Sequence, residues 1–356
     1  MHTEHGTVPA DYLEYTRRKG LWIAGALFLV VLLFILAISV GAVSIPPADV
    51  VQTLFGAGTS AKWDRIIWNI RLPQALAAIV AGTGLAVAGV AMQSILRNPL
   101  ASPYTLGISS AGAFGAAVSI IVLGAGKIQS TMANPVTITN PYLTTIIAFF
   151  FCMLATAVIL LISHLRGASP EVMILTGVAL SALFSAGVMF LQYFSSDTQL
   201  AAVVFWTFGD VGRSTWETLP FMAVVVAGAT LYFLLNRWNY NAIDAGDETA
   251  QGLGVSVARV RLAGMTVAAL VSAVIVALLG VIGFVGLVCP HMMRRIVGDD
   301  QRYLIPGTAV AGAVLLLASD TVARVIVAPY ILPVAVLTAF MGAPVFIYLL
   351  FRGYKR

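Results

Sequence analysis

A compact polar stretch, AIDAGDETAQGLGVSVARVR at residues 242–261, stands between long apolar segments of this sequence. Three of the chain's fifteen acidic residues, Asp244, Asp247 and Glu248, fall within five positions of it. Acidic residues close to glycines and to exposed apolar residues can form a short surface unit that a partner protein binds. The same composition also fits an ordinary loop in water, so the residues alone leave both interpretations open.

Nowhere in the sequence does a group of residues have the spacing that predicts catalysis or metal binding. Cys152 and Cys289 lie inside apolar stretches, the four histidines are scattered, and GAGK at 124–127 lacks the first glycine of a phosphate-binding loop. Asp320 is the acidic residue that we place inside an apolar stretch, and it can pair with Arg324 four positions later on one helix. One such pair gives little support to ion-coupled transport, and nothing here predicts an enzyme.

The composition defines the class of protein that must position these residues. The chain is 60% hydrophobic and 10% charged, with a mean hydropathy of +0.95. Soluble domains carry about 25% charged residues. The sequence therefore predicts an integral membrane protein, and the net charge of +5 does not indicate nucleic-acid binding.

Nine uncharged stretches could each hold a transmembrane helix of about 20 residues. They are residues 20–48, 72–96, 98–126, 128–163, 172–196, 218–236, 262–293, 303–319 and 325–351. Both chain ends are basic, which places both in the cytoplasm and requires an even number of spans. As one helix, 262–293 would reach about 48 Å, against a hydrocarbon core of about 30 Å. Its middle, LLGVIGFVG at 278–286, has three glycines at which the chain can reverse.

Splitting this stretch predicts an all-α, polytopic protein with ten transmembrane helices. Residues 1–20 form an N-terminal tail, 21–352 the ten-span domain, and 353–356 a C-terminal tail, both tails being cytoplasmic. Of the 20 Lys and Arg residues, this topology places fourteen inside and five outside, with Arg324 near a span end. Small residues at four-residue spacings predict close helix packing; they are Gly82, Gly84, Ala86, Ala88, Gly107, Ala111 and Gly115.

Four motifs resemble the FecCD-type permeases of ABC importers, the type II importers for iron–siderophores, haem and cobalamin. The motifs are RLPQALAAIVAGTGLAVAGVAMQSILRNPLASPYTLGISSAGAFGAA at 71–117, GFVGLVCPHMMRR at 283–295, SDTVAR at 319–324 and LPVAVLTAFMGAPVFIYLL at 332–350. The resemblance covers residues 20 to 352 and supports the ten-helix type II permease fold.

The resemblance implies partners that the residues alone do not. A homodimer, or a pair with a similar permease chain, would enclose the pathway within the lipid membrane, lined by 172–194 and 333–350. Two ABC ATPase subunits would bind ATP and Mg²⁺, this chain holding no cofactor, and an extracytoplasmic binding protein would deliver substrate. The expected location is the cytoplasmic membrane of a prokaryote. Ferric siderophore is the first substrate expected, then haem or cobalamin; an ion-coupled secondary transporter is the alternative from another class.

Within the polar insert, the resemblance assigns 242–258 as the segment that couples the permease to the ATPase. Its coupling residues would be Gly246, Asp247, Glu248, Ala250, Leu253, Gly254 and Val255. The residue types fit this role. Asp247 and Glu248 favour a helix start, and Gly252 and Gly254 favour a break between two short helices. Leu253 and Val255 would offer apolar contacts to the partner.

At the outer face, the resemblance assigns Arg71 and Arg324 to docking of the binding protein's carboxylates. Arginine near an outer span end runs against the positive-inside trend, which supports this assignment, although Arg324 could instead serve only to pair with Asp320. The family commonly has RLPR where this chain has RLPQ, so Gln74 removes one expected cation. The cytoplasmic gate would lie at Ala168, Ser169, Pro170 and Glu171.

Overall fold

The computed structural model describes residues 10–41, 43–57, 60–127, 137–138, 140–328 and 330–353. Its α-helices are α1 (Ala10–Ser39), α2 (Pro47–Leu54), α3 (Ala61–Ile66), α4 (Leu72–Ile95), α5 (Ile108–Ala117), α6 (Pro141–Leu165), α7 (Pro170–Tyr193), α8 (Asp197–Thr207), α9 (Leu219–Leu235), α10 (Arg237–Asp244), α11 (Asp247–Gly252), α12 (Val257–Leu279), α13 (Val285–Val297), α14 (Gln301–Ala323) and α15 (Val334–Gly353). Two π-helical turns, Ile67–Arg71 and Val118–Val122, precede α4 and follow α5, and Val211–Arg213 forms a 3-10 turn. The short strands β1 (Gly126–Lys127) and β2 (Thr137–Ile138) pair antiparallel.

The all-α prediction is confirmed, and a helix lies within each of the ten predicted spans. Within the described part of the chain, six helices are long and apolar enough to cross a membrane. A seventh results if α9 and α10, bent by 59° at their junction, form one span. Ile108–Val122 and Val334–Tyr348 are apolar but shorter. The number of ten crossings therefore stays a prediction.

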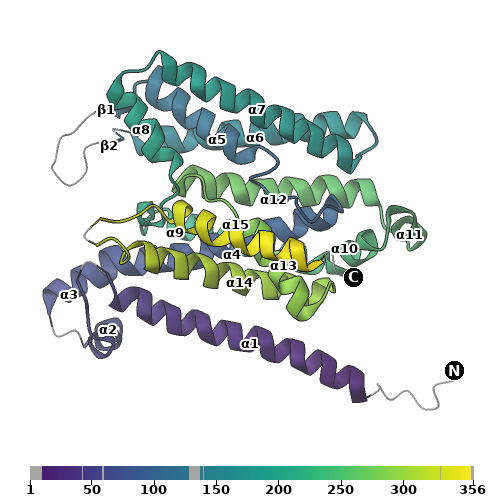
Figure 1. The fold of residues 1–356 in the computed structure, drawn as a ribbon, viewed down its shortest axis with the longest axis horizontal. Coiled ribbons are helices and arrows are strands. Elements are labelled where there is room, and N and C mark those ends of the chain that lie inside the picture. The colour runs from purple at the N-terminus through teal and green to yellow at the C-terminus, as the bar shows by residue number, and fades with distance from the viewer. Residues whose placement is uncertain are drawn as a thin grey trace.

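The helices form a bundle with two distinct ends (Figure 1). One end, here the α11 end, holds α10 and α11; the other, the α2 end, holds α2 and α3. Helix α1 begins and α15 finishes at the α11 end, in agreement with the even number of spans predicted from the charges. Helix α1 packs on α14, α4 lies between α14 and α12, and α5 to α7 form the far side of the bundle.

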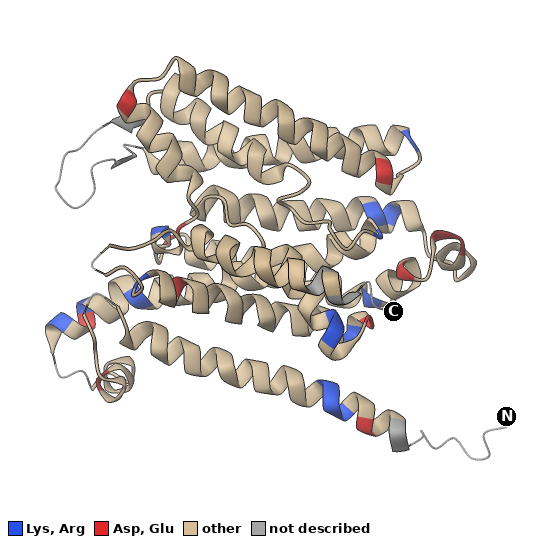
Figure 2. Cartoon of the chain, viewed as in Figure 1, with Lys and Arg blue, Asp and Glu red and all other residues tan. Residues whose placement is uncertain are grey.

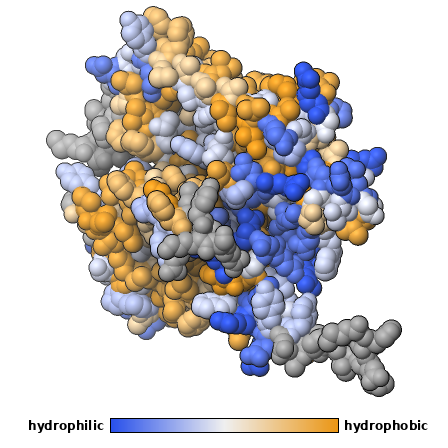
Figure 3. All heavy atoms as spheres, turned by 45° about the vertical axis from the view of Figure 1, so that its right-hand side comes forward, coloured by the Kyte–Doolittle hydropathy of each residue, from blue (hydrophilic) through white to orange (hydrophobic). Residues whose placement is uncertain are grey.

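Charged residues gather at these two ends and are sparse between them (Figure 2). The space-filling view shows the same division, with a hydrophilic area over the α11 end and hydrophobic atoms over much of the rest of this face (Figure 3). Many large apolar side chains on the helices are exposed, among them Phe28, Leu161 and Leu175. This pattern is expected of a bundle whose sides face lipid rather than water.

Helix α4 is the centre of the packing, and its glycines explain how. It contacts α14, α12, α13 and α9. A β-carbon added at Gly89 would stand 1.9 Å from the carbonyl oxygen of Gly286 on α13. One added at Gly82 would stand 2.3 Å from the carbonyl oxygen of Gly312 on α14. These helices therefore approach at backbone-to-backbone distance, which confirms the packing predicted for the small residues of 82–88.

The predicted reversal inside 262–293 is present. Helix α12 ends at Leu279, Gly280 has a φ of +82°, and α13 begins at Val285. The freed backbone groups are paired, because Gly209 N donates to Val281 O (3.1 Å) and Asp210 N to Leu279 O (2.8 Å). With 13 residues, α13 reaches only about 20 Å and is shorter than a full crossing.

The close crossing of α4 and α13 predicts a specific sensitivity. Gly89→Ala should lower the free energy of unfolding by about 1–3 kcal/mol, because the added methyl group meets a backbone carbonyl that cannot turn aside. Gly228→Ala, in α9, is the control, since nothing lies within 4 Å of its added β-carbon. Unfolding of both variants in detergent, followed by circular dichroism, checks this. Equal stability of the two variants would contradict the packing described.

Candidate functional site

The predicted coupling segment folds as a small unit of two helices at the α11 end. Helix α10 ends at Asp244, Gly246 with φ of +123° separates it from α11, and Gly254 with φ of +83° separates α11 from α12. The break between the two short helices therefore lies at Gly246. The sequence analysis placed it at Gly252 and Gly254, and that prediction is wrong. The unit has its own apolar core of Ala242, Ile243, Ala250 and Val257, against which Val255 and Val260 pack.

The seven predicted coupling residues divide into outward-facing and inward-facing positions. Leu253 is 71% exposed, and Glu248 and Gly254 are also exposed. Ala250 is fully buried in the core of the unit, and Gly246 and Val255 are half-buried. Asp247 turns inward toward α12. Exposed apolar and acidic side chains thus remain available on a unit whose other side is fixed to the bundle.

The inward side is fixed at two polar anchors. The first is Arg261 on α12, which is 2% exposed. Its Nη2 donates to both carboxylate oxygens of Asp247 (2.9 and 3.0 Å), its Nε to Ile95 O (2.9 Å) and its Nη1 to Ala168 O (3.1 Å). One guanidinium group therefore joins α11, the last turn of α4 and the loop before α7.

The second anchor holds α10 to α14. Gln301 Nε2 donates to Asp244 Oδ2 (2.9 Å) and to Ser94 Oγ (2.7 Å), and Asn241 Oδ1 accepts from Gln301 N (2.8 Å). Asp300 accepts from Asn241 Nδ2 (3.1 Å). Partial burial opposes ionisation of Asp300, but hydrogen bonds from Arg302 and Asn241 outweigh it and lower the pKa of this carboxyl to about 2. Asp300 therefore stays ionised, and paired with Arg302, well below neutral pH.

The predicted gate residues lie beside the coupling unit. Ala168 is buried with a φ of +57°, Ser169 precedes α7 and donates a short hydrogen bond to the Glu171 carboxylate, and Pro170 is the first residue of α7. A polar cavity of about 490 Å³ is formed by these loop residues, by the end of α4 and by the first anchor. Its lining is Leu96, Arg97, Gly167, Ser169, Pro170, Glu171, Asp247 and Arg261. The structure thus brings together two segments that the sequence analysis treated separately.

Arg71 is at the α2 end, as predicted, but its side chain is buried. It is 5% exposed, and its guanidinium donates to Ile38 O (2.6 Å), Ser39 O (3.0 Å) and Val43 O. The carbonyls of Ile38 and Ser39 belong to the end of α1, which has no basic residue in its own last turn, and Val43 follows the helix. Because the last carbonyls of a helix lack partners within it, Arg71 satisfies them from another segment.

Arg324 performs the same task from α14. It is 6% exposed, donates through Nη1 to Ala37 O (3.0 Å) and Val40 O (3.3 Å), and pairs with Asp320 at 3.1 Å. Asp320 also accepts from Gln74 Nε2 (2.9 Å), so Gln74 contributes a hydrogen bond where the family commonly has a cation. Sequence reasoning found the pair but missed the contacts with α1. A docking role for both arginines stays a prediction, since neither side chain faces solvent here.

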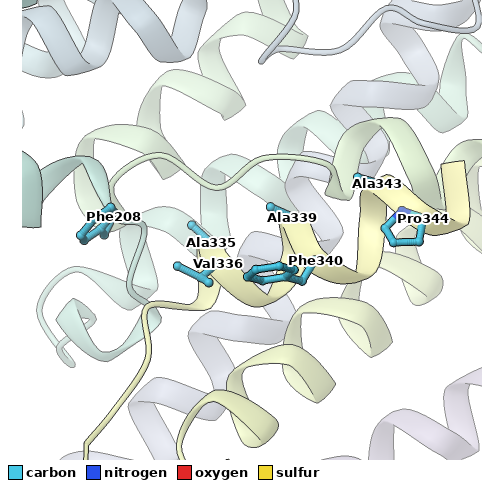
Figure 4. Close-up of a pocket in the computed structure, with 7 residues that line it drawn as sticks. All are labelled: Phe208, Ala335, Val336, Ala339, Phe340, Ala343 and Pro344. Carbon is cyan, nitrogen blue, oxygen red and sulfur yellow. The ribbon is translucent and has the colours of Figure 1, made fainter. Parts of the chain in front are cut away.

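The predicted pathway helices are exposed along apolar faces. Helix α15 and Phe208 line an apolar hollow of about 570 Å³ (Figure 4). Its other residues are Ala335, Val336, Ala339, Phe340, Ala343 and Pro344. Helix α7 is only 11% buried over its most apolar window. In the described residues no group of three or more His, Cys, Asp or Glu could hold a metal ion.

Comparison with known proteins identifies the class. The FecCD transport family matches residues 29–352, and the chain belongs to this family. It is 51% identical over 351 residues to a protein of Methanocaldococcus jannaschii named as an ABC transporter permease, covering 98% of this chain and 99% of that one. A solved structure of a metal-chelate type ABC transporter in an inward-facing conformation superposes with a TM-score of 0.80 at 31% identity. The superposition covers 93% of this chain and 98% of the chain in that structure.

Two further relatives have named substrates. The hemin transport permease of Yersinia pestis is 38% identical, covering 91% of this chain and 94% of its own. The Fe(3+)-citrate import permease of Bacillus subtilis is 34% identical, covering 94% and 97%. This chain is therefore the permease of an ABC importer of the metal-chelate, haem and vitamin B12 type, a transport subunit and not an enzyme.

The buried arginine contacts give the second prediction. Arg71→Ala should destabilise the chain by about 2–4 kcal/mol, because it removes the hydrogen bonds that a buried guanidinium donates to the carbonyls of Ile38 and Ser39. Arg65→Ala, at an exposed position of α3 at the same end, removes the same charge and serves as the control. Thermal unfolding in detergent measures both variants. A loss of binding-protein affinity in Arg71→Ala without loss of stability would instead support docking as its main role.

Proposed function

We propose that this chain is the membrane permease of an ATP-driven importer for a ferric chelate, with ferric siderophore as the first candidate. Two copies, or this chain with a similar permease chain, enclose the pathway. Two ATPase subunits bind ATP and Mg²⁺ and attach at the α11 end, which lies in the cytoplasm. A substrate-binding protein docks at the α2 end, where Arg71 and Arg324 are the proposed docking positions.

The observation that carries this proposal is the coupling unit of α10 and α11. It presents exposed Leu253 and Glu248 outward, and it is held inward by Arg261 and Gln301. An exposed leucine beside a carboxylate is a fitting contact for a partner protein, while the fixed inner side can transmit the partner's movement. Because a loop without a partner needs no such rigid connection, the unit favours coupling over simple solvation.

The substrate class is supported by the relatives, whose names include hemin and Fe(3+)-citrate. A ferric siderophore shares with them an iron centre held by an organic ligand. Haem and cobalamin are the alternatives within the family. The pathway of a dimer would explain why α7 and α15 leave apolar faces uncovered, since a second copy or the passing chelate would lie against them.

Ion-coupled transport is the alternative from a different class, and Asp320 is the residue that would serve it. Its carboxylate is paired with Arg324 at 3.1 Å, accepts from Gln74 at 2.9 Å and is 3% exposed. Because both partners of the Asp320 carboxylate are buried, this carboxylate is fixed in place. Ion coupling requires a carboxylate that binds and releases its ion. The geometry therefore favours the ATP-driven importer.

Transport measurements test the function. The chain, its ATPase and its binding protein are reconstituted in liposomes, and uptake of labelled ferric siderophore, haem and cobalamin is followed with and without enclosed ATP. We expect ATP-dependent uptake of the ferric siderophore. Glu248→Arg combined with Leu253→Asp should lower it at least about tenfold, because both changes oppose attachment of the ATPase and tenfold corresponds to only about 1.4 kcal/mol.

The matched control is Glu14→Arg combined with Leu13→Asp. These residues are exposed on α1 at the same end, so the control makes the same changes away from the coupling unit. It should transport like the unaltered chain. Uptake that ignores ATP and follows an ion gradient would overturn the importer and direct attention to Asp320. ATP-dependent uptake of haem or cobalamin alone would retain the importer and correct the substrate.

A further inference from the structure

Arg261 occupies a position that the sequence analysis did not assign to any function. It lies at the start of α12, directly after the coupling unit, and its side chain is 3% exposed. Three of its contacts belong to three different segments. These are Asp247 on α11, the carbonyl of Ile95 at the end of α4, and the carbonyl of Ala168 in the loop before α7.

We propose that Arg261 is the positioning residue that transmits movement of α11 to the loop before α7, residues 166–169, which holds the predicted gate residues Ala168 and Ser169 and is called the gate loop below. This inference rests on the proposed function of α10 and α11 as the coupling unit. One nitrogen of Arg261, Nη2, contacts both carboxylate oxygens of Asp247, and the planar guanidinium group fixes the directions in which Nε and Nη1 donate to Ile95 O and Ala168 O. A displacement of Asp247 therefore moves or breaks the hydrogen bond to Ala168.

The surroundings make this link the direct connection between the two segments. Arg261 and Asp247 line the polar cavity of about 490 Å³ together with Ser169 of the gate loop and Glu171 in the first turn of α7. A cavity offers no packed side chains through which a push from α11 could pass. Ala168 itself is held at a φ of +57°, so its carbonyl keeps its direction toward the guanidinium only while the loop keeps this conformation.

The second anchor has a different geometry and a different consequence. Gln301, Ser94 and Asp244 join α10 to α14 and α4, and these hydrogen bonds do not involve the gate loop. This anchor attaches the coupling unit to the core of the bundle. Ser94 and Ile95 are neighbours in the last turn of α4, so both anchors are attached to the same part of this helix. Of the two anchors, the first one continues to residues 166–169, through the hydrogen bond from Arg261 to Ala168 O.

The first test measures the link in the permease chain alone. Cysteines introduced at the exposed positions Gln251 on α11 and Arg166 in the gate loop receive spin labels, while native Cys152 and Cys289 are buried. Labelled chain is diluted with unlabelled chain, and the distance distribution is measured by pulsed electron paramagnetic resonance. We expect a narrow distribution that broadens in Arg261→Met and in Asp247→Asn. Arg259→Met, an exposed arginine two residues away, should leave it unchanged.

The second test measures coupling in the reconstituted complex. Arg261→Met should keep ATPase attachment and hydrolysis within about twofold, while chelate uptake for each ATP hydrolysed falls at least about tenfold, within the usual range of coupling between sites. If Arg261→Met does not fold, Asp247→Asn decides, because it leaves the guanidinium bound to both carbonyls. A purely structural role would lower attachment, hydrolysis and uptake together and would overturn the inference.

The two proposals fail in different ways. Unchanged uptake per ATP in Asp247→Asn, or an unchanged distance distribution in both variants, would overturn the role of Arg261 while leaving the importer intact. Absence of ATP-dependent uptake in the unaltered complex would instead overturn the proposed function. In that case the distance measurement still decides whether Arg261 joins α11 to the gate loop, since it needs neither the ATPase nor a substrate.

Discussion

The constraint on which this structure depends is that carbonyl groups at helix ends must find donors inside an apolar bundle. The last carbonyls of a helix have no partner within it, and lipid supplies none. Arginines from other segments supply the donors here. Arg71 and Arg324 serve the end of α1, Arg261 serves the end of α4, and Arg213 donates to Phe205 O (2.6 Å), Trp206 O (3.1 Å) and Phe208 O (3.0 Å) at the end of α8.

This use of arginine explains why the charge pattern predicted the architecture better than the roles of single residues. The distribution of basic residues predicted that both chain ends share one side, and in the structure α1 begins and α15 ends at the same end of the bundle. The resemblance assigned Arg71 and Arg324 to docking of the binding protein, and the charge pattern supported this, since an arginine near an outer span end runs against the positive-inside trend. In the structure, both arginines donate to carbonyls of α1. These partners lie more than thirty positions from Arg71 in the sequence, and no local spacing reveals a partner at that separation.

Other features show the same limit of sequence reasoning. Composition and apolar length predicted the helices, and the glycines of 278–286 predicted the reversal, because each depends on local chemistry. The gate and the coupling segment were also predicted, but as unrelated segments. Their proximity depends on Arg261, which reads in the sequence as one more basic residue of a cytoplasmic loop. The short helix α8 and the pairing of β1 with β2 were not predicted, since two to eleven residues give too weak a periodic signal.

Helix α4 connects these observations into one mechanical arrangement. Its middle is held at backbone contact by Gly82 against Gly312 and by Gly89 against Gly286, so it cannot slide without breaking both crossings. Its last turn accepts from Arg261 at Ile95 and takes part in the second anchor through Ser94. A rigid helix fixed in this way acts as the reference against which the coupling unit can move. On the proposed role of Arg261, movement of α11 passes from Asp247 through Arg261 to Ala168, because the alternative of displacing α4 would cost its close packing against α13 and α14.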